Sequence, residues 1–111
     1  GLHLNTKEIS RFGQMLLNRG RYAGKQLVPE DYLAMATRKQ IDNAGTPDWS
    51  CGYGFQFWMC VPEHVYRGDG ANGQYCIVCP DQDAVIAITS HEEKNLQGIL
   101  DCVWQEILPQ L

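Results

Sequence analysis

The last segment of the chain has its most regular apolar pattern, and this pattern restricts the folds that the chain can adopt. On a helix over residues 95–108, the apolar side chains form one continuous stripe, made of Leu96, Ile99, Leu100, Val103, Trp104, Ile107 and Leu108. A helix with such a stripe has to bury it against a sheet or another helix. The preceding segments must therefore supply a second layer.

The middle of the chain has the pattern of strands. Four segments are predicted as strands, at residues 52–60, 65–69, 74–78 and 84–89. Two short connections, Asn72-Gly73 and residues 80–83, favour tight turns, because Asn and Gly tolerate positive φ. Strands joined in this way form an antiparallel meander.

Two further helices are predicted near the N-terminus. Asn5 and Glu8 have the spacing of a capping box at the start of a helix over residues 5–18, and Gly20 can end it. The second helix covers residues 29–38, with a proline at its first turn. This order of elements predicts an α+β fold, in which helices cover an antiparallel meander of about four strands.

The composition restricts the classes of function. The chain has 111 residues, enough for one domain or part of a larger one, and a net charge of −4. That charge argues against a general partner for nucleic acid or anionic membranes, which requires a basic surface. No apolar run approaches the ~18 residues of a membrane span, and no signal-peptide pattern is present.

The five cysteines are interpreted mostly as buried, reduced thiols; a disulfide or a reactive thiol is the alternative. Cys76 and Cys79 form a C-x-x-C pair, but positions i and i+3 of a strand point to opposite faces. The three histidines stand alone, so two further zinc ligands are missing. We expect no metal and no cofactor, and the thiols slightly favour a cytoplasmic location.

Three other features have competing interpretations. The R-G-D triplet at Arg67 would need an exposed loop tip for adhesion, but it falls in or beside a predicted strand. Trp49 lies in the long loop, where it can join the core or line a site. Residues 68–73 hold three glycines, which fit either a glycine-rich hairpin or a strand edge that a ligand approaches closely.

The order and spacing of these segments resemble the C-terminal part of the serine β-lactamase, penicillin-binding-protein and esterase superfamily, nearest to its class C-like members. The matching stretches are GLHLNTKEISRFGQMLLNRG, GKQLVPEDYL, GYGFQFW, GDGANGQY with CIVCP, and AVIAITS. Together they cover nearly the whole chain. The resemblance implies a partial β-lactamase-like fold over residues 1–111, with a helical part at 1–40 and strands plus the last helix at 49–111.

The resemblance also implies where an active-site wall would lie. The family's third motif, K-T-G or H-x-G, aligns with Gly68, Asp69 and Gly70, so that Gly68 replaces the Lys or His. Ala71 then falls where the family donates one oxyanion-hole N–H through its backbone, and Asn72 follows as a further substrate-binding position. The S-x-x-K motif with the nucleophile and the Tyr-x-Asn motif are both missing.

The resemblance therefore implies part of a serine hydrolase that cleaves an ester, amide or lactam through an acyl-enzyme, the chain itself being inactive. The N-terminal part of the same hydrolase would be its partner. The alternative is a non-catalytic binding or interaction domain that keeps the fold. We also expect self-association through apolar surface on the sheet or around Ile9, Phe12, Leu16 and Leu17 of the first helix.

Overall fold

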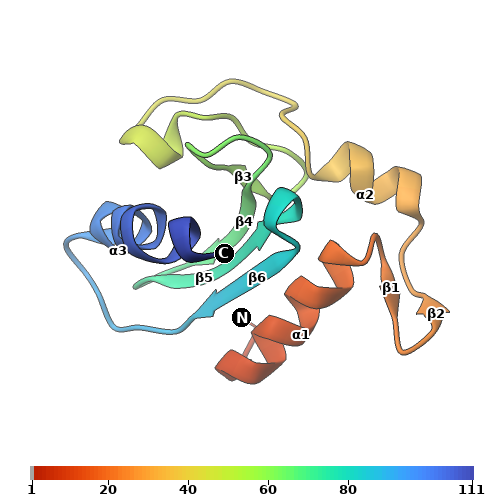
Figure 1. Cartoon of the computed structure of the whole chain (residues 1–111). Coiled ribbons are helices and arrows are strands. Elements are labelled where there is room, and N and C mark those ends of the chain that lie inside the picture. Colours follow the sequence, from red (N-terminus) through yellow and green to blue (C-terminus); the bar gives the residue numbers. More distant parts are fainter. Residues whose placement is uncertain (1) are drawn as a thin grey trace.

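The computed structural model describes residues 2–111 and shows an α+β fold (Figure 1). Its main sheet has four antiparallel strands in the order β3-β4-β5-β6: Trp58–Met59, Tyr66–Gly70, Gln74–Cys79 and Ala84–Ile88. Its α-helices are α1 (Thr6–Leu17), α2 (Glu30–Ala36) and α3 (Leu96–Cys102). The predicted meander and fold class are thus confirmed.

Helices α1 and α3 cover opposite faces of this sheet (Figure 1). The alternation of side chains along β5 separates two cores, because neighbouring residues of a strand point to opposite faces. Tyr75, Ile77 and Cys79 pack with Leu100 and Val103 of the C-terminal helical segment. On the other face, Val78 of β5 packs with residues of α1 and α2.

Helix α1 has the predicted ends. The Asn5 side chain accepts a hydrogen bond from the Glu8 N–H, the Glu8 carboxylate accepts one from the Asn5 N–H, and Gly20 follows the helix with a φ of +91°. Met15 and Leu16 are buried in one cluster with Tyr66 of β4 and Val78 of β5. The division of the chain into a helical part at residues 1–40 and a part with the strands stays a prediction. Within this chain, α1 packs in one core with residues of β4 and β5.

The aromatic segment at 52–60 does not form the single strand that its composition predicts. Only Trp58–Met59 is a strand, and Tyr53 turns back to pair with Trp58. Gly52 and Gln56 have positive φ, and the Gly54 N–H donates to the Phe57 carbonyl oxygen. These residues close a turn, which shortens the strand.

The last helix begins where it is predicted and ends differently. Asn95 caps it, because the Asn95 side chain accepts a hydrogen bond from the Gly98 N–H. α-Helical geometry stops at Cys102 and a wider π-helical turn, Val103–Ile107, follows. The predicted stripe still meets the sheet, with Leu100 and Val103 buried.

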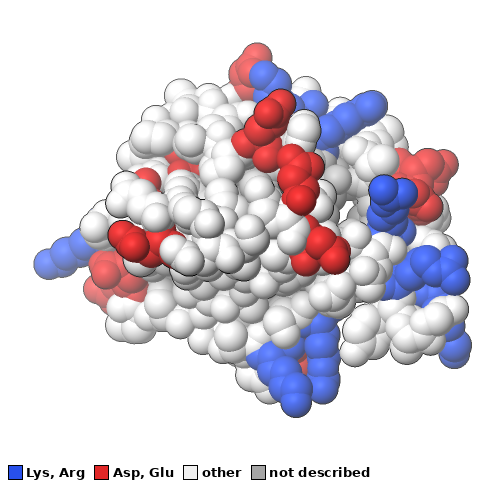
Figure 2. Space-filling view, in the orientation of Figure 1, with Lys and Arg blue, Asp and Glu red and all other residues white. Residues whose placement is uncertain are grey.

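A two-stranded hairpin, β1 (Arg21–Tyr22) with β2 (Lys25–Gln26), and helix α2 extend to one side of the sheet (Figure 1). Acidic and basic side chains are interspersed on the face in Figure 2, with a broad area free of charge between them. Within residues 2–111, no helix has the length and apolar content to cross a bilayer.

Candidate active-site wall

The residues predicted as a wall line a hollow of about 530 Å³ between the end of β4 and the start of α1. A volume of this size is typical of small-molecule sites. The β4 side of the hollow is formed by Gly68, Asp69, Gly70 and Ala71. Its other residues are Leu2, Leu4, Ile9, Phe12, Gln74, Tyr75 and Cys76. The predicted position Asn72 is not among them.

The hollow adjoins a free strand edge. On its β3 side, β4 pairs only through Tyr66 and Arg67, whereas Gly68–Gly70 pair only with β5. Within residues 2–111, the backbone N–H of Ala71 makes no hydrogen bond. A peptide-like or acyl group could therefore add to this edge and meet backbone donors there.

Gly73 and Gly68 lie near this edge, and the fold requires glycine at only one of the two positions. Gly73 has a φ of +84°, and a side chain there would collide with Ser90 and Ile99. The turn therefore needs glycine at this position. At Gly68 a Cβ would meet only Cys76 Cβ at 3.9 Å, an ordinary contact. The fold does not need glycine at position 68, so its effect is to leave space in the hollow.

Asn72 belongs to the turn that closes the hairpin. Its φ is +65°, as the prediction of a tight turn requires, and its carbonyl oxygen accepts from Ser90 Oγ at 2.9 Å and from the Glu92 N–H at 3.0 Å. These bonds join the hairpin to the segment before α3. The structure thus gives Asn72 a role in shaping the wall, and its contact with a substrate remains a prediction.

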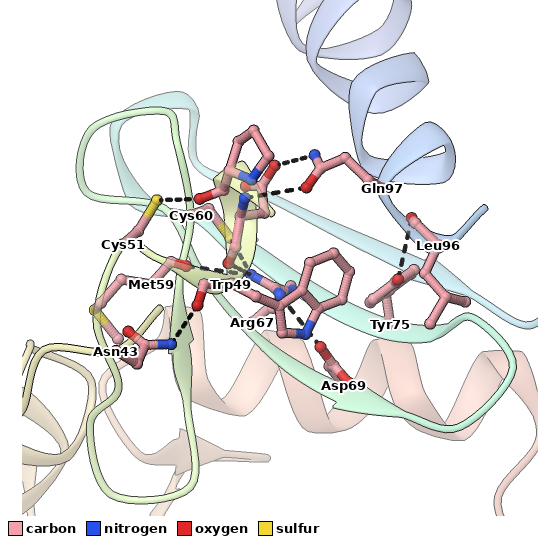
Figure 3. Close-up of polar contacts among 12 residues, drawn as sticks. Asn43, Trp49, Cys51, Met59, Cys60, Arg67, Asp69, Tyr75, Leu96 and Gln97 are labelled. Carbon is pink, nitrogen blue, oxygen red and sulfur yellow. Dashed lines mark hydrogen bonds and ion pairs between the residues drawn. The ribbon is translucent and has the colours of Figure 1, made fainter. Parts of the chain in front are cut away.

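Arg67 anchors β4 beside Trp49 (Figure 3), and its strand partner Ile77 packs on the α3 face of the sheet. Its side chain is fully buried, and the guanidinium lies over the Trp49 ring, 4.5 Å from the centroid. Nη1 donates to the carbonyl oxygens of Asp48 at 3.1 Å and Met59 at 3.2 Å. These bonds fix the long loop and β3 beside the site strand.

Asp48 ties the same loop to the C-terminal helix. Its carboxylate, which is buried, accepts from Gln97 Nε2 at 2.6 Å, from Trp104 Nε1 at 3.0 Å and from the Val61 N–H at 2.9 Å. Buried carboxylates need such donors, because an unpaired charge in the interior is costly. Arg67 and Asp48 together connect β4, the long loop and α3.

Asp69 is the charged residue at the rim of the hollow. Its Oδ2 lies 3.2 Å from Arg67 Nη2, an ion pair in which the N–H is not aimed as in a hydrogen bond. The side chain is 17% exposed, although the residue as a whole is open through its backbone. Burial raises the pKa of this carboxyl above its ordinary value, and the Arg67 guanidinium and Trp49 oppose the rise.

No serine of the described part of the chain is activated. Each of its three serine hydroxyls donates to a backbone carbonyl oxygen: Ser10 to Lys7, Ser50 to Pro47 and Ser90 to both Asn72 and Gly73. A serine nucleophile instead needs a base within hydrogen-bond reach. The wall therefore stands without a nucleophilic serine among residues 2–111.

The cysteine in the hollow is not a nucleophile that could take the place of a serine. All five thiols are free, and burial raises the pKa of Cys76, which lines the hollow, to about 11. A thiol in that state is protonated at neutral pH and a poor nucleophile. Cys76 faces α1, with Sγ 3.6 Å from the Ile9 carbonyl oxygen, whereas Cys79 lies in the core under α3. The C-x-x-C pair thus diverges as predicted.

The structure also decides between the interpretations of the R-G-D triplet. Arg67 of the R-G-D triplet is inaccessible, so the triplet is no adhesion loop. Within residues 2–111, no group of three metal-binding side chains gathers. The sequence does not predict the roles of Arg67 and Asp48. The one pattern that points to this region is Trp49, an aromatic residue in a polar loop, whose ring packs against Arg67.

Comparison with protein-family profiles and with curated proteins finds no match. Among solved structures, the whole chain superposes on a Bacillus anthracis protein provisionally named 6-aminohexanoate-dimer hydrolase, with 27% identity and a TM-score of 0.76. The match covers 100% of this chain and 31% of that protein, a hydrolase of the β-lactamase-like superfamily. The chain is accordingly a hydrolase-related domain with a partial β-lactamase-like fold, and it spans about a third of that neighbour's length.

Proposed function

We propose that this chain forms one wall of the active site of a β-lactamase-like serine hydrolase. The enzyme cleaves an ester, amide or lactam through an acyl-enzyme, and its nucleophile lies on a part of the protein outside these 111 residues. The observation that carries the proposal is the hollow beside the free end of β4, where the Ala71 N–H is unbonded.

In this proposal the acyl group lies along Gly68–Gly70, where glycine leaves room. The Ala71 N–H is one oxyanion donor, and the N–H of the nucleophilic serine is the other. A donor aimed at the developing oxyanion contributes about 3 kcal/mol to transition-state stabilisation. Arg67 acts through β4 by holding the strand in place, and Asp69 adds a charged rim.

The proposal predicts that the 111-residue chain alone turns over neither a chromogenic cephalosporin nor a nitrophenyl acetate. A longer form of the protein that carries an S-x-x-K segment should cleave at least one of them. Turnover by the purified chain that is lost on Ser10→Ala, Ser50→Ala or Ser90→Ala would contradict the proposal, because the nucleophile would then lie within these 111 residues.

A second candidate is a non-catalytic binding domain, which the absence of an activated serine in the described residues favours. The coding sequence upstream of Gly1 discriminates between the two. An S-x-x-K followed by a Tyr-x-Asn-like motif supports the hydrolase, whereas an unrelated domain or a start codon supports the binding domain.

A further inference from the structure

The lining of the hollow is apolar on its helical side. Leu2 and Leu4, which precede α1, and Ile9 and Phe12 of α1 line the hollow, and Phe12 keeps 44% of its surface exposed even though α1 packs on the sheet. Exposed leucine and phenylalanine side chains gathered around one concavity are typical of a binding surface for apolar groups.

The lining also offers no cation to an anionic ligand. Among the described lining residues, Asp69 is the charged one, and its carboxylate is paired with Arg67 toward the opposite face of the sheet. The Cys76 thiol and the Tyr75 hydroxyl stay neutral, because burial raises their pKa values to about 11 and about 12. A carboxylate in this hollow would lose water without gaining a positive partner.

Gly68 is the position from which a cation could enter. Its backbone needs no glycine, and a Cβ there would have open space on the α1 face, where its strand partner Cys76 also lies. A long basic side chain at position 68 would therefore fit the fold and reach the hollow. The glycine found there keeps the hollow both roomy and uncharged.

We propose that the hollow binds an uncharged apolar acyl group and discriminates against the carboxylate of the same chain length. This inference rests on the proposed function, because it takes the free β4 edge as the place where the acyl group lies. The apolar chain of the ligand packs against Phe12 and Leu4, and its carbonyl end meets the backbone of Gly70 and Ala71.

Equilibrium binding tests the inference without any turnover. Backbone amide signals of the ¹⁵N-labelled chain are followed by NMR as hexanamide or hexanoate is added, two ligands of equal length that differ in charge. We expect hexanamide to shift the Gly68, Gly70 and Ala71 signals with a Kd at least about tenfold lower than that of hexanoate. Equal affinities, or shifts confined to other residues, would overturn the inference.

Two pairs of variants sharpen the test. Phe12→Ala should weaken hexanamide binding severalfold, whereas Phe55→Ala, which removes a similarly exposed ring outside the hollow, should not. Gly68→Lys should reverse the preference toward hexanoate, whereas Gln105→Lys adds the same charge on an exposed site elsewhere and should leave it unchanged. The NMR spectrum itself reports whether each variant is folded.

The outcomes separate this inference from the proposed function. If the longer protein cleaves no ester, amide or lactam but the chain still prefers hexanamide with the expected variant effects, the hydrolase proposal fails and the acyl pocket stands. If turnover is found while hexanoate binds as well as hexanamide, the pocket assignment fails and the hydrolase proposal stands.

Discussion

At the scale of single residues, Arg67 shows how the protein stabilises a buried charge. No part of its side chain meets solvent, and it is surrounded by two carbonyl acceptors, the Asp69 carboxylate and the rings of Trp49, Trp58 and Tyr75. Its Nε has no hydrogen-bond partner in the described residues. The aromatic rings, rather than a full set of hydrogen bonds, therefore complete the environment of this guanidinium.

Replacing this arginine should be costly. Arg67→Met keeps a similar volume but leaves the Asp48 and Met59 carbonyl groups without their donor and Asp69 without its ion-pair partner, so we expect a loss of about 3 kcal/mol in the free energy of unfolding. Urea denaturation followed by circular dichroism measures it. Arg19→Met is the matched control, because its ion pair with Glu30 is exposed and should change stability by less than about 0.5 kcal/mol. Equal losses for the two variants would show that burial of Arg67 is unimportant.

His64 gives a pH dependence that can be assigned to one contact. Its Nδ1 lies 2.8 Å from Asp81 Oδ2, and this hydrogen bond, with the charges of Asp81 and Glu63, raises the pKa of His64 above 6.5. Since the folded state binds the proton more tightly, the stabilisation is complete below pH 6.5 and disappears as the pH rises through the raised pKa.

Asp81→Asn should therefore lower the His64 pKa toward its ordinary value and flatten the pH dependence of stability above pH 6.5. NMR titration of the imidazole measures the pKa directly. Asp83→Asn removes a neighbouring exposed carboxylate that makes no contact with His64, and it should leave the titration nearly unchanged. If Asp81→Asn leaves the pKa of His64 unchanged, Asp81 is not the group that raises it.

At the scale of elements, the packing of α1 on the sheet depends on one glycine. A Cβ at Gly13 would collide with the Val85 side chain and lie 2.9 Å from Cys76 Sγ. The helix can therefore approach β5 and β6 closely only without a side chain at this position. The same contact fixes α1 as one side of the hollow.

Gly13→Ala should destabilise the protein although alanine is the better helix former. Helix propensity alone would favour the change by about 1 kcal/mol, whereas overpacking costs about 1–3 kcal/mol, so we expect a net loss. Thermal unfolding measures the sign. Gln14→Ala, at the next and exposed position, removes only an exposed hydrogen bond to Asn18, so it should be nearly neutral. A stabilised Gly13→Ala protein would show that α1 can move away from the sheet.

The elements that sequence reasoning located are those with strong local signals. The capping box at Asn5, the Asn72-Gly73 turn and the stripe on the last helix each follow from a few adjacent residues. The turn at residues 52–58 was missed because a positive φ at Gln56 has no sequence signature, and aromatic composition outweighed Gly52 and Gly54. The Arg67 environment could not be predicted, since its partners come from four separate segments.

At the scale of the whole molecule, the three layers serve different parts of the candidate site. The sheet presents the β4 edge, α3 and the long loop hold it from one face through Asp48 and Arg67, and α1 supplies the apolar side of the hollow (Figures 1 and 3). Most of the connections that hold the wall lie on the face away from the hollow. The open face is thus left for a substrate or for another part of a larger protein.

The apolar surface on this open side is where we expect association. Within the predicted set, Leu16 is packed in the core and Ile9 and Leu17 are half-buried, so Phe12 is its exposed member. Leu2 and Leu4 are exposed in the hollow beside β4, and Tyr22 and Leu27 are exposed around a second hollow on the other side of Phe12. The exposed patch therefore extends from Leu2 across α1 to the β1–β2 hairpin, and burial of such surface returns about 25 cal/mol per Å².

We predict that the isolated chain self-associates through this patch at micromolar concentration. Sedimentation velocity should show a species heavier than the 12.5 kDa monomer, and Phe12→Gln with Leu27→Gln should shift it toward the monomer. Ile41→Gln with Val61→Gln removes two similarly exposed apolar side chains outside the patch and should leave the association intact. A monomer at every concentration would show that the chain tolerates this surface in water, and it would weaken the proposal that another part of a hydrolase covers it.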